Sequence, residues 1–150
     1  TPLQMAQVAA CLANGGRVVR PRLLGATRPY GGTAFELVPP EPPRDLGWPA
    51  AVLAPIREGM RQVVMSENGT GRRARTAVVE AAGKTGTAEF GPREARRKRG
   101  WMIAFAPYDA PRYAIALVVD DALSGGLTAA PLVKELLEAL FAPPAEGARG

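Results

Sequence analysis

Three extended segments follow one another between residues 82 and 120, and only short connections separate them. The sequence predicts strands at about 82–89, 100–106 and 112–120, joined by a polar loop at 90–99 and a proline-containing turn. Strands with such short connections pair antiparallel, because parallel neighbours need a crossover of roughly a dozen residues or more. The last segment is apolar without interruption from Tyr113 to Val119, which is typical of a strand covered on both faces. These patterns predict an antiparallel three-strand meander.

Helical patterns flank the strands. Thr1-Pro2 suits the start of a helix, with Thr as the N-cap, and Asn14-Gly15-Gly16 should end it. A second helix is expected within 50–65, where Pro55 either begins the helix or kinks it. A final helix is expected at about 129–141. Its apolar stripe, which should pack onto the sheet, consists of Leu132, Val133, Leu136, Leu137 and Leu140.

The remaining segments are predicted to be irregular. Residues 25–49 are rich in glycine and proline, with one possible strand at Phe35–Val38, and a short extended run precedes them at 18–24. Together the elements predict an α+β fold in which helices back an antiparallel sheet. The folded portion is expected to be residues 1–141, followed by a disordered tail at 142–150.

The composition removes several classes of chemistry. The chain has 150 residues, a formal net charge of +5, one cysteine and no histidine. A Ser-His-Asp triad, a Cys-His dyad and a histidine-ligated zinc site are therefore excluded, and we expect no metal and no cofactor. Cys11 lies among alanines on the first predicted helix and is interpreted as a buried structural thiol. No apolar run reaches the length of about 18 residues that predicts a transmembrane helix.

The most informative motif is Lys84-Thr85-Gly86-Thr87, in the first predicted strand. Taken alone, such a lysine is compatible with a solvated strand edge that discourages aggregation. The same tripeptide Lys-Thr-Gly is one of three signature elements of the serine acyl-transferases that react with penicillin, beside Ser-x-x-Lys and a Ser-x-Asn-type motif. Ser66-Glu67-Asn68 spells the last of these, but its glycine-rich neighbours suit a plain turn.

Five blocks along residues 1–141 resemble class B penicillin-binding proteins, and the closest type is penicillin-binding protein 2. In order, the blocks are Thr1–Gly16 with Arg20-Pro21, Arg57–Met60 with Gly69-Thr70, Ala82–Glu89, Trp101–Pro107 and Ala129–Pro131. Two positions depart from the family pattern. Arg99-Gly100 stands where a histidine often precedes the tryptophan, and Met102 replaces a phenylalanine. Both changes are expected to alter the rim of the site rather than its central chemistry.

The resemblance implies the C-terminal part of a transpeptidase domain with a partial penicillin-binding/serine β-lactamase-like fold. In this family a serine attacks a D-Ala–D-Ala peptide, and the acyl group then passes to an amine of a neighbouring stem peptide. By resemblance, Lys84 stabilises the terminal carboxylate and assists proton transfer, while the hydroxyls of Thr85 and Thr87 hydrogen-bond that carboxylate. The backbone N–H of Thr87 would contribute to the oxyanion hole, and Gly86 would let the substrate lie alongside the strand.

The other two signature elements are expected upstream of this chain. The start Thr1-Pro2-Leu3 is neither an initiator methionine nor a signal peptide, so we expect a longer parent protein anchored by an upstream helix. Ser66 and Ser124 have no lysine three residues on, so the chain alone is predicted to be inactive. The resemblance implies the bacterial cell envelope, on the extracytoplasmic side of the inner membrane. It also implies peptidoglycan stem peptides, β-lactams and cell-wall elongation membrane proteins as partners.

Two alternatives remain open from the sequence: a fragment of a serine β-lactamase or penicillin sensor, and a non-catalytic interaction module that kept the scaffold. The basic segment is open as well. Its cations could belong to a solvated loop, line the substrate groove or contact anionic lipid headgroups. They are Arg93, Arg96, Arg97, Lys98 and Arg99. We expect no nucleic-acid binding, because no recognition motif or interleaved aromatic residues accompany them.

Overall fold

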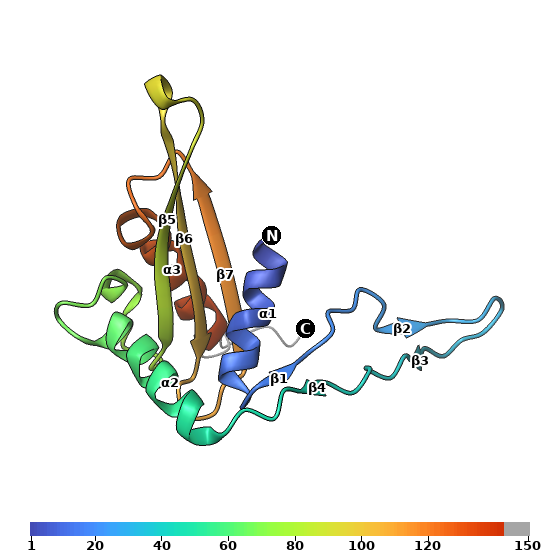
Figure 1. The fold of residues 1–150 in the computed structure, drawn as a ribbon. Helices are drawn as coiled ribbons and strands as arrows, with labels where there is room; N and C mark the ends of the chain where they lie inside the picture. Colours follow the sequence, from blue (N-terminus) through green and yellow to red (C-terminus); the bar gives the residue numbers. More distant parts are fainter. Residues whose placement is uncertain (143–150) are drawn as a thin grey trace.

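The protein is an α+β domain built on one three-stranded antiparallel sheet, and the predicted fold class is confirmed (Figure 1). The structure, a computed structural model, describes residues 1–142, so nearly all of the predicted disordered tail lies outside the described residues. The strands are β5 (Ala82–Phe90), β6 (Arg97–Ala106) and β7 (Tyr113–Asp120), in the spatial order β5-β6-β7. Both pairings are antiparallel, as expected for a meander.

Helix α1 (Pro2–Ala13) begins where the sequence predicts. The Gln4 N–H donates to the Thr1 hydroxyl at 3.3 Å, and the Gln4 side chain returns to the Thr1 backbone, which completes a capping box. Asn14 caps the other end. The helix packs against β6 and β7, and Cys11 is buried as predicted. Burial raises the pKa of the Cys11 thiol, because a thiolate is poorly solvated there.

Helix α2 (Ala50–Met65) passes through Pro55, which the sequence left as either a start or a kink. The turn before the proline is helical because it buries Leu53, whose side chain lies beside Gly16 and Trp48. Farther along, Met60 and Val64 are also buried, and the helix packs against β5. Among residues 1–142, no helix has the length and apolar character that crossing a membrane requires.

The sheet carries a hydrophobic cluster on each face. One cluster joins Ala9 and Ala13 of α1 to Phe105 and Ile103 of β6. The other is covered by helix α3 (Ala130–Phe141) and consists of Val64, Ala74, Ala81, Met102, Ala104, Ala106, Ala129, Ala130, Val133 and Leu137. Strand β7 was predicted to be covered on both faces, but Tyr113–Val119 stays partly exposed along its length.

Only part of the predicted apolar stripe of α3 packs onto the sheet. Val133 and Leu137 are fully buried against the sheet, whereas Leu132, Leu136 and Leu140 remain 37–42 % exposed. The five positions cover two adjacent helix faces, and only one of these faces can touch the sheet. The structure therefore presents an apolar helix face to solvent on the outer side of α3.

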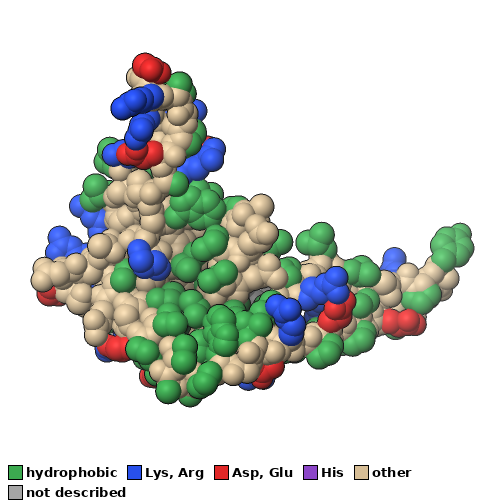
Figure 2. All heavy atoms as spheres, in the orientation of Figure 1, with side chains coloured by type: hydrophobic (Ala, Val, Ile, Leu, Met, Phe, Trp, Pro, Cys, Tyr) green, Lys and Arg blue, Asp and Glu red, His purple; other side chains and the backbone are tan. Residues whose placement is uncertain are grey.

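A long arm, residues 17–48, leaves the domain between α1 and α2 (Figure 1). Strand β1 (Arg17–Val18) pairs with β4 (Arg44–Asp45) at its base, and β2 (Ala26–Thr27) pairs with β3 (Glu36–Leu37) farther out. The predicted extended run at 18–24 is thus mostly unpaired, and the possible strand at 35–38 shortens to two residues. Figure 2 shows hydrophobic side chains along this arm. Those that are exposed include Leu23, Tyr30, Phe35 and Leu37.

We expect the isolated 150-residue chain to be marginally stable and to self-associate. Strand β7 ends the sheet within residues 1–142, so its outer N–H and C=O groups lack a strand partner, and the outer face of α3 exposes leucines. An unpaired strand edge together with exposed apolar surface is a template for pairing with another chain, and such association would satisfy these groups. Sedimentation and a thermal melt test this. A monomer with a sharp cooperative transition at high temperature would contradict it.

Candidate active-site strand

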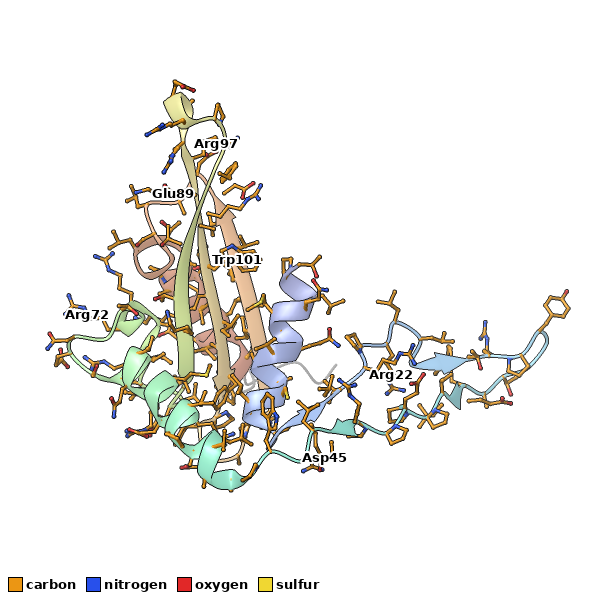
Figure 3. All side chains as sticks on the ribbon, in the orientation of Figure 1. Arg22, Asp45, Arg72, Glu89, Arg97 and Trp101 are labelled. Carbon is orange, nitrogen blue, oxygen red and sulfur yellow. The ribbon has the colours of Figure 1, made fainter. Side chains whose placement is uncertain are left out.

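The motif Lys84–Thr87 lies in the middle of β5, an edge strand of the sheet. Strand β6 pairs with one side of it, so that Lys84 lies opposite Ile103 and Gly86 lies opposite Trp101. Figure 3 labels Trp101. Ala82 and Gly83 are buried, whereas Lys84, Gly86 and Thr87 are exposed. The motif therefore begins where the covered half of the strand gives way to an accessible half.

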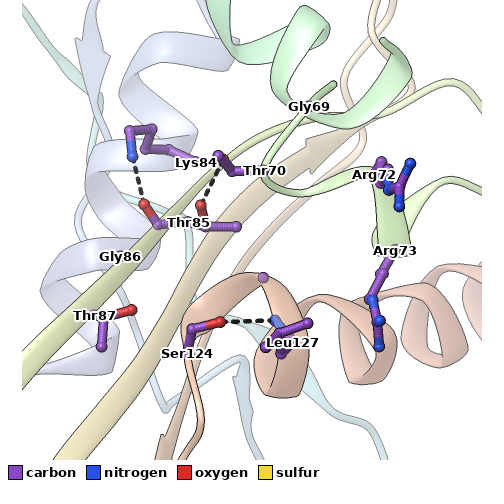
Figure 4. Close-up of a pocket in the computed structure, with 11 residues that line it drawn as sticks. Gly69, Thr70, Arg72, Arg73, Lys84, Thr85, Gly86, Thr87, Ser124 and Leu127 are labelled. Carbon is purple, nitrogen blue, oxygen red and sulfur yellow. Dashed lines mark hydrogen bonds between the residues drawn. The ribbon is translucent and has the colours of Figure 1, made fainter. Parts of the chain in front are cut away.

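A groove of about 560 Å³ opens on this part of β5 (Figure 4). It unites the strand with the turn that follows α2 and the loop that precedes α3. Its lining residues are Gly69, Thr70, Arg72, Arg73, Lys84, Thr85, Gly86, Thr87, Ser124, Gly126 and Leu127. All four motif residues line the groove, and the lining includes three cations, four hydroxyl groups and no carboxylate. This composition suits a ligand that carries negative charge.

Thr85 is anchored from behind by the turn after α2. The residue is only 8 % exposed, and its Oγ1 lies 2.8 Å from Oγ1 of Thr70. The turn can hold Thr70 there because Gly69 has no side chain: a Cβ atom on Gly69 would lie 2.2 Å from the carbonyl oxygen of Val63. The hydroxyl pair fixes the position of Thr85 in the groove wall.

Thr87 is anchored by the loop that leads into α3. The N–H of Gly125 donates to Oγ1 of Thr87 at 3.3 Å. This loop forms a single π-helical turn (Gly125–Ala129), and the N–H of Leu127 donates to Oγ of Ser124 at 3.1 Å to cap it. A Cβ atom on Gly125 would lie 2.4 Å from the carbonyl oxygen of Gly86, so glycine is required for the loop to lie flat on the strand.

Lys84 is the exposed cation of the strand. Its Nζ donates to the carbonyl oxygen of Thr85 (Figure 4). The lysine also borders a second cavity of about 290 Å³, whose other lining residues include Thr1, Met5 and Trp101. Lys84 therefore lines both the groove and the second cavity, and its ammonium group is available to a ligand in either.

The chain contains two serines, and the structure gives both a structural role. The Ser66 hydroxyl donates to the carbonyl oxygen of Gln62 at 2.7 Å and closes α2, so the Ser66-Glu67-Asn68 segment is a turn as predicted. Ser124 caps the loop before α3 and lines the groove. Within residues 1–142, no hydrogen bond joins either serine to a lysine or to a carboxylate.

The basic segment is largely part of the sheet, so the predicted polar loop at 90–99 is too long. Strand β5 continues to Phe90 and β6 begins at Arg97, because the two strands form a ladder of cross-strand pairs. The Arg99 guanidinium lies 4.1 Å from the centre of the Phe90 ring and 2.7 Å from Asp120. Arg97 pairs with Asp121 and holds the pKa of that carboxyl below its usual range.

This pairing neutralises most of the basic charge. Arg96 also pairs with Glu89, at 2.7 Å. Figure 3 labels Glu89 and Arg97 on this hairpin. Residues 89–99 together with Asp120 and Asp121 carry five cations and four carboxylates. The net charge of this hairpin is therefore small, which weakens the interpretation that it contacts anionic lipid.

The departure at Met102 affects the core rather than the rim. Its side chain is fully buried in the cluster beneath α3, and its Cε atom lies close to Gly71 and Gly83. The sequence predicts that Met102 alters the rim of the site. Because the side chain lies in the core, it can affect the rim only through the packing around it. Gly100 is also buried, and its missing side chain leaves room for Ala122 and Ser124.

The fold agrees with the comparisons with known proteins. The profile of the penicillin binding protein transpeptidase domain matches residues 1–138. The chain belongs to this family, and its relatives confirm the predicted penicillin-binding protein 2 type. It is 34 % identical over 160 aligned positions to the peptidoglycan D,D-transpeptidase MrdA of Salmonella typhimurium, covering 97 % of this chain and 26 % of MrdA. Identity to the peptidoglycan D,D-transpeptidase PbpA of Mycolicibacterium smegmatis is 36 %, covering 93 % and 29 %.

Solved structures of the family superpose on most of the chain. The penicillin-binding protein 2 of Pseudomonas aeruginosa, solved in complex with WCK 5153, matches with a TM-score of 0.75 and 32 % identity, over 97 % of this chain and 31 % of that one. An imipenem acyl-enzyme complex of penicillin-binding protein A from Mycobacterium tuberculosis matches with a TM-score of 0.71 and 32 % identity, over 93 % and 31 %. The chain spans just over a quarter of the length of MrdA and of PbpA.

Proposed function

We propose that this chain is the C-terminal part of the transpeptidase domain of a peptidoglycan D,D-transpeptidase, with residues 1–141 as the folded portion. The observation that carries the proposal is the groove on β5, in which Lys84, Thr85, Gly86 and Thr87 meet hydroxyl groups and two further cations. Such a groove suits the C-terminal carboxylate of a D-Ala–D-Ala peptide or the carboxylate of a β-lactam. MrdA and PbpA are named as transpeptidases, which favours this function over a β-lactamase or penicillin sensor.

Each motif residue has a role that its position supports. Lys84 is an exposed ammonium group that can pair with the ligand carboxylate and assist proton transfer. The hydroxyls of Thr85 and Thr87 can donate to the same carboxylate from anchored positions. Gly86 presents no side chain to a ligand that lies along the strand.

The backbone N–H of Thr87 is the proposed oxyanion donor within this chain. In an antiparallel pair, the N–H and C=O groups of alternate residues point away from the partner strand. Thr85 and Thr87 are two residues apart, and the carbonyl of Thr85 accepts from the Lys84 side chain. This is consistent with outward-pointing backbone groups at both threonines. The second donor would be the N–H of the catalytic serine.

The proposed reaction is acyl transfer through a serine outside this chain. The serine oxygen forms a bond to the carbonyl carbon of the penultimate D-Ala, and the bond from that carbon to the terminal D-Ala nitrogen breaks. The serine proton passes, through a basic side chain, to the departing amine. An amine of a second stem peptide then forms a bond to the ester carbonyl carbon, and the bond from that carbon to the serine oxygen breaks. The amine proton returns to the serine oxygen through the basic side chain, which completes the cross-link. A β-lactam acylates the same serine, with opening of its ring.

The proposed setting is the bacterial cell envelope, on the extracytoplasmic side of the inner membrane, where stem peptides are the substrates. Cell-wall elongation membrane proteins are the proposed partners of the full-length polypeptide. A related structure supports this choice: a complex between penicillin-binding protein 2 and MreC of Helicobacter pylori matches the chain with a TM-score of 0.69 and 26 % identity. The direct test of the function is covalent labelling of the full-length polypeptide by a fluorescent penicillin, with competition by unlabelled benzylpenicillin.

The isolated 150-residue chain should form no covalent adduct with the fluorescent penicillin. Ser66 and Ser124 are its only serines, and in the described residues both hydroxyls serve as caps without a base beside them. Intact-mass measurement after incubation tests this expectation. A mass increase equal to that of the drug, localised to either serine, would refute it.

A further inference from the structure

The groove extends past the motif to a second cationic position, which no sequence motif marks. Arg72 and Arg73 line the same groove as Lys84 and Thr87 (Figure 4). Both arginines are exposed, and both belong to the short 3-10 helix η1 (Arg72–Ala74). Their guanidinium groups therefore reach the solvent of the groove from the side opposite β5.

The backbone that carries these arginines is fixed. Ala74 is fully buried in the cluster beneath α3, and its N–H donates to the Gly71 carbonyl at 2.8 Å. The N–H of Arg75 donates to the Arg72 carbonyl at 3.0 Å and closes the turn. Two neighbouring arginines on a fixed turn are a pre-organised source of positive charge, since only their side chains must be ordered when a ligand binds.

No carboxylate within residues 1–142 forms an ion pair with either arginine of η1. Arg72 donates to the backbone carbonyl of Glu67 at 3.0 Å. The carboxylate of Glu67 is engaged by Arg75 at 2.8 Å, whose hydrogen bond and charge lower the Glu67 pKa, and the charge of Arg72 adds only the smallest contribution. The contrast with the basic hairpin is clear, because three of the arginines there have an acidic partner. The positive charge of η1 is therefore available to a ligand.

We propose that Arg72 and Arg73 form a second anion-binding position of the groove, which takes an acidic group carried by the ligand in addition to the carboxylate held at Lys84 and Thr87. This inference rests on the proposed function, since it assigns both positions to one acyl-transfer ligand. The substrate class it favours is a peptide with an acidic group besides its C-terminal carboxylate. Ligands with two anionic groups should then react faster than matched ligands with one.

Two cephalosporins provide a matched probe. Cefamandole and cefonicid share the same acyl side chain and differ at the tetrazole ring, which bears a methyl group in cefamandole and a sulfomethyl group in cefonicid. The measured quantity is the ratio of their second-order acylation rate constants with the full-length polypeptide. Arg73→Gln, together with Arg72→Gln, should lower the cefonicid-to-cefamandole ratio about three- to fivefold, the upper part of the range expected for exposed charge pairs. At about 1 M salt the wild-type ratio should fall toward that of the variant, because screening then acts within roughly 3 Å.

Two further variants separate a local effect from a change of fold or of net charge. Arg73→Lys keeps the charge and should keep most of the ratio. Arg93→Gln removes one charge from an exposed arginine of the basic hairpin that does not line the groove, so it should leave the ratio unchanged. An unchanged ratio in the Arg72/Arg73 variant, or an equal drop in Arg93→Gln, would overturn the second anion position.

The same experiment separates this inference from the proposed function. If neither cephalosporin acylates the wild-type polypeptide, the proposed function itself fails. If both acylate it and the ratio is insensitive to Arg72 and Arg73, the proposed function stands and the second anion position is wrong. A fall in cefamandole reactivity as large as that in cefonicid reactivity would assign the arginines to the first carboxylate instead, which also contradicts the proposal.

Discussion

Replacing Lys84 with alanine in the full-length polypeptide should slow acylation by benzylpenicillin on the order of a hundredfold or more, with the folded state retained. The ammonium group of Lys84 contacts the Thr85 carbonyl and lines the groove with both threonines, so its loss removes both the charge proposed to hold the carboxylate and a group proposed to assist proton transfer. Stability should change little, because the side chain is exposed and its only hydrogen bond in the described chain is to the Thr85 carbonyl.

Lys98→Ala provides the matched control. Lys98 is an exposed lysine on the adjacent strand β6, opposite Glu89, and it does not line the groove. Stopped-flow acylation kinetics and thermal melts of the two variants should separate them: both melt like the wild type, and only Lys84→Ala reacts slowly. Wild-type acylation kinetics in Lys84→Ala would remove this lysine from the site.

Replacing Gly125 with alanine should damage both stability and reactivity. The new Cβ atom would lie 2.3 Å from the Trp101 carbonyl oxygen and 2.4 Å from that of Gly86. Both obstacles are backbone atoms of paired strands, so the loop before α3 must lift away from β5. Overpacking of this kind costs about 1–3 kcal/mol. The shift would also break the hydrogen bond from Gly125 to Thr87, so the groove should lose its shape there.

Gly59→Ala is the control for this substitution. Gly59 is an exposed residue of α2, and a Cβ atom there would have no neighbour within 4 Å. Alanine at an exposed helix position should leave acylation unchanged and stabilise the fold by roughly 0.5–1 kcal/mol. If Gly125→Ala melted and acylated like the wild type, the close packing of the loop on β5 would not be required.

Local chemistry made the element order predictable. Thr1 and Pro2 favour a helix start through a nearby hydrogen bond and a fixed φ angle, and the apolar segments of β6 and β7 are typical of strands. Pro55 could not be decided in this way. Its missing N–H disfavours the helix, while burial of Leu53 near Gly16 favours it, and that contact joins residues distant in the sequence.

Only the contiguous part of the candidate site could be predicted, because the other part depends on contacts between residues distant in the sequence. Lys84, Thr85, Gly86 and Thr87 are contiguous, so a motif can reveal them. Thr70 and Ser124 enter the groove only through the turn after α2 and the loop before α3, and nothing local in the sequence ties them to β5. Apart from the family block that contains Gly69-Thr70, the available signal was the set of glycines at 69, 71, 125 and 126, which marks places of close backbone approach without telling what is approached.

The hydroxyl pair of Thr70 and Thr85 gives the groove wall a reversible polarity. Either oxygen can be the donor in this hydrogen bond, and each hydroxyl proton can rotate without movement of heavier atoms. When Thr85 donates to Thr70, its oxygen offers a lone pair to the groove. When Thr70 donates to Thr85, the proton of Thr85 is free to turn toward an anion. An arriving carboxylate can thus convert this point of the wall from acceptor to donor, and the departing product can convert it back, while the strand itself stays still.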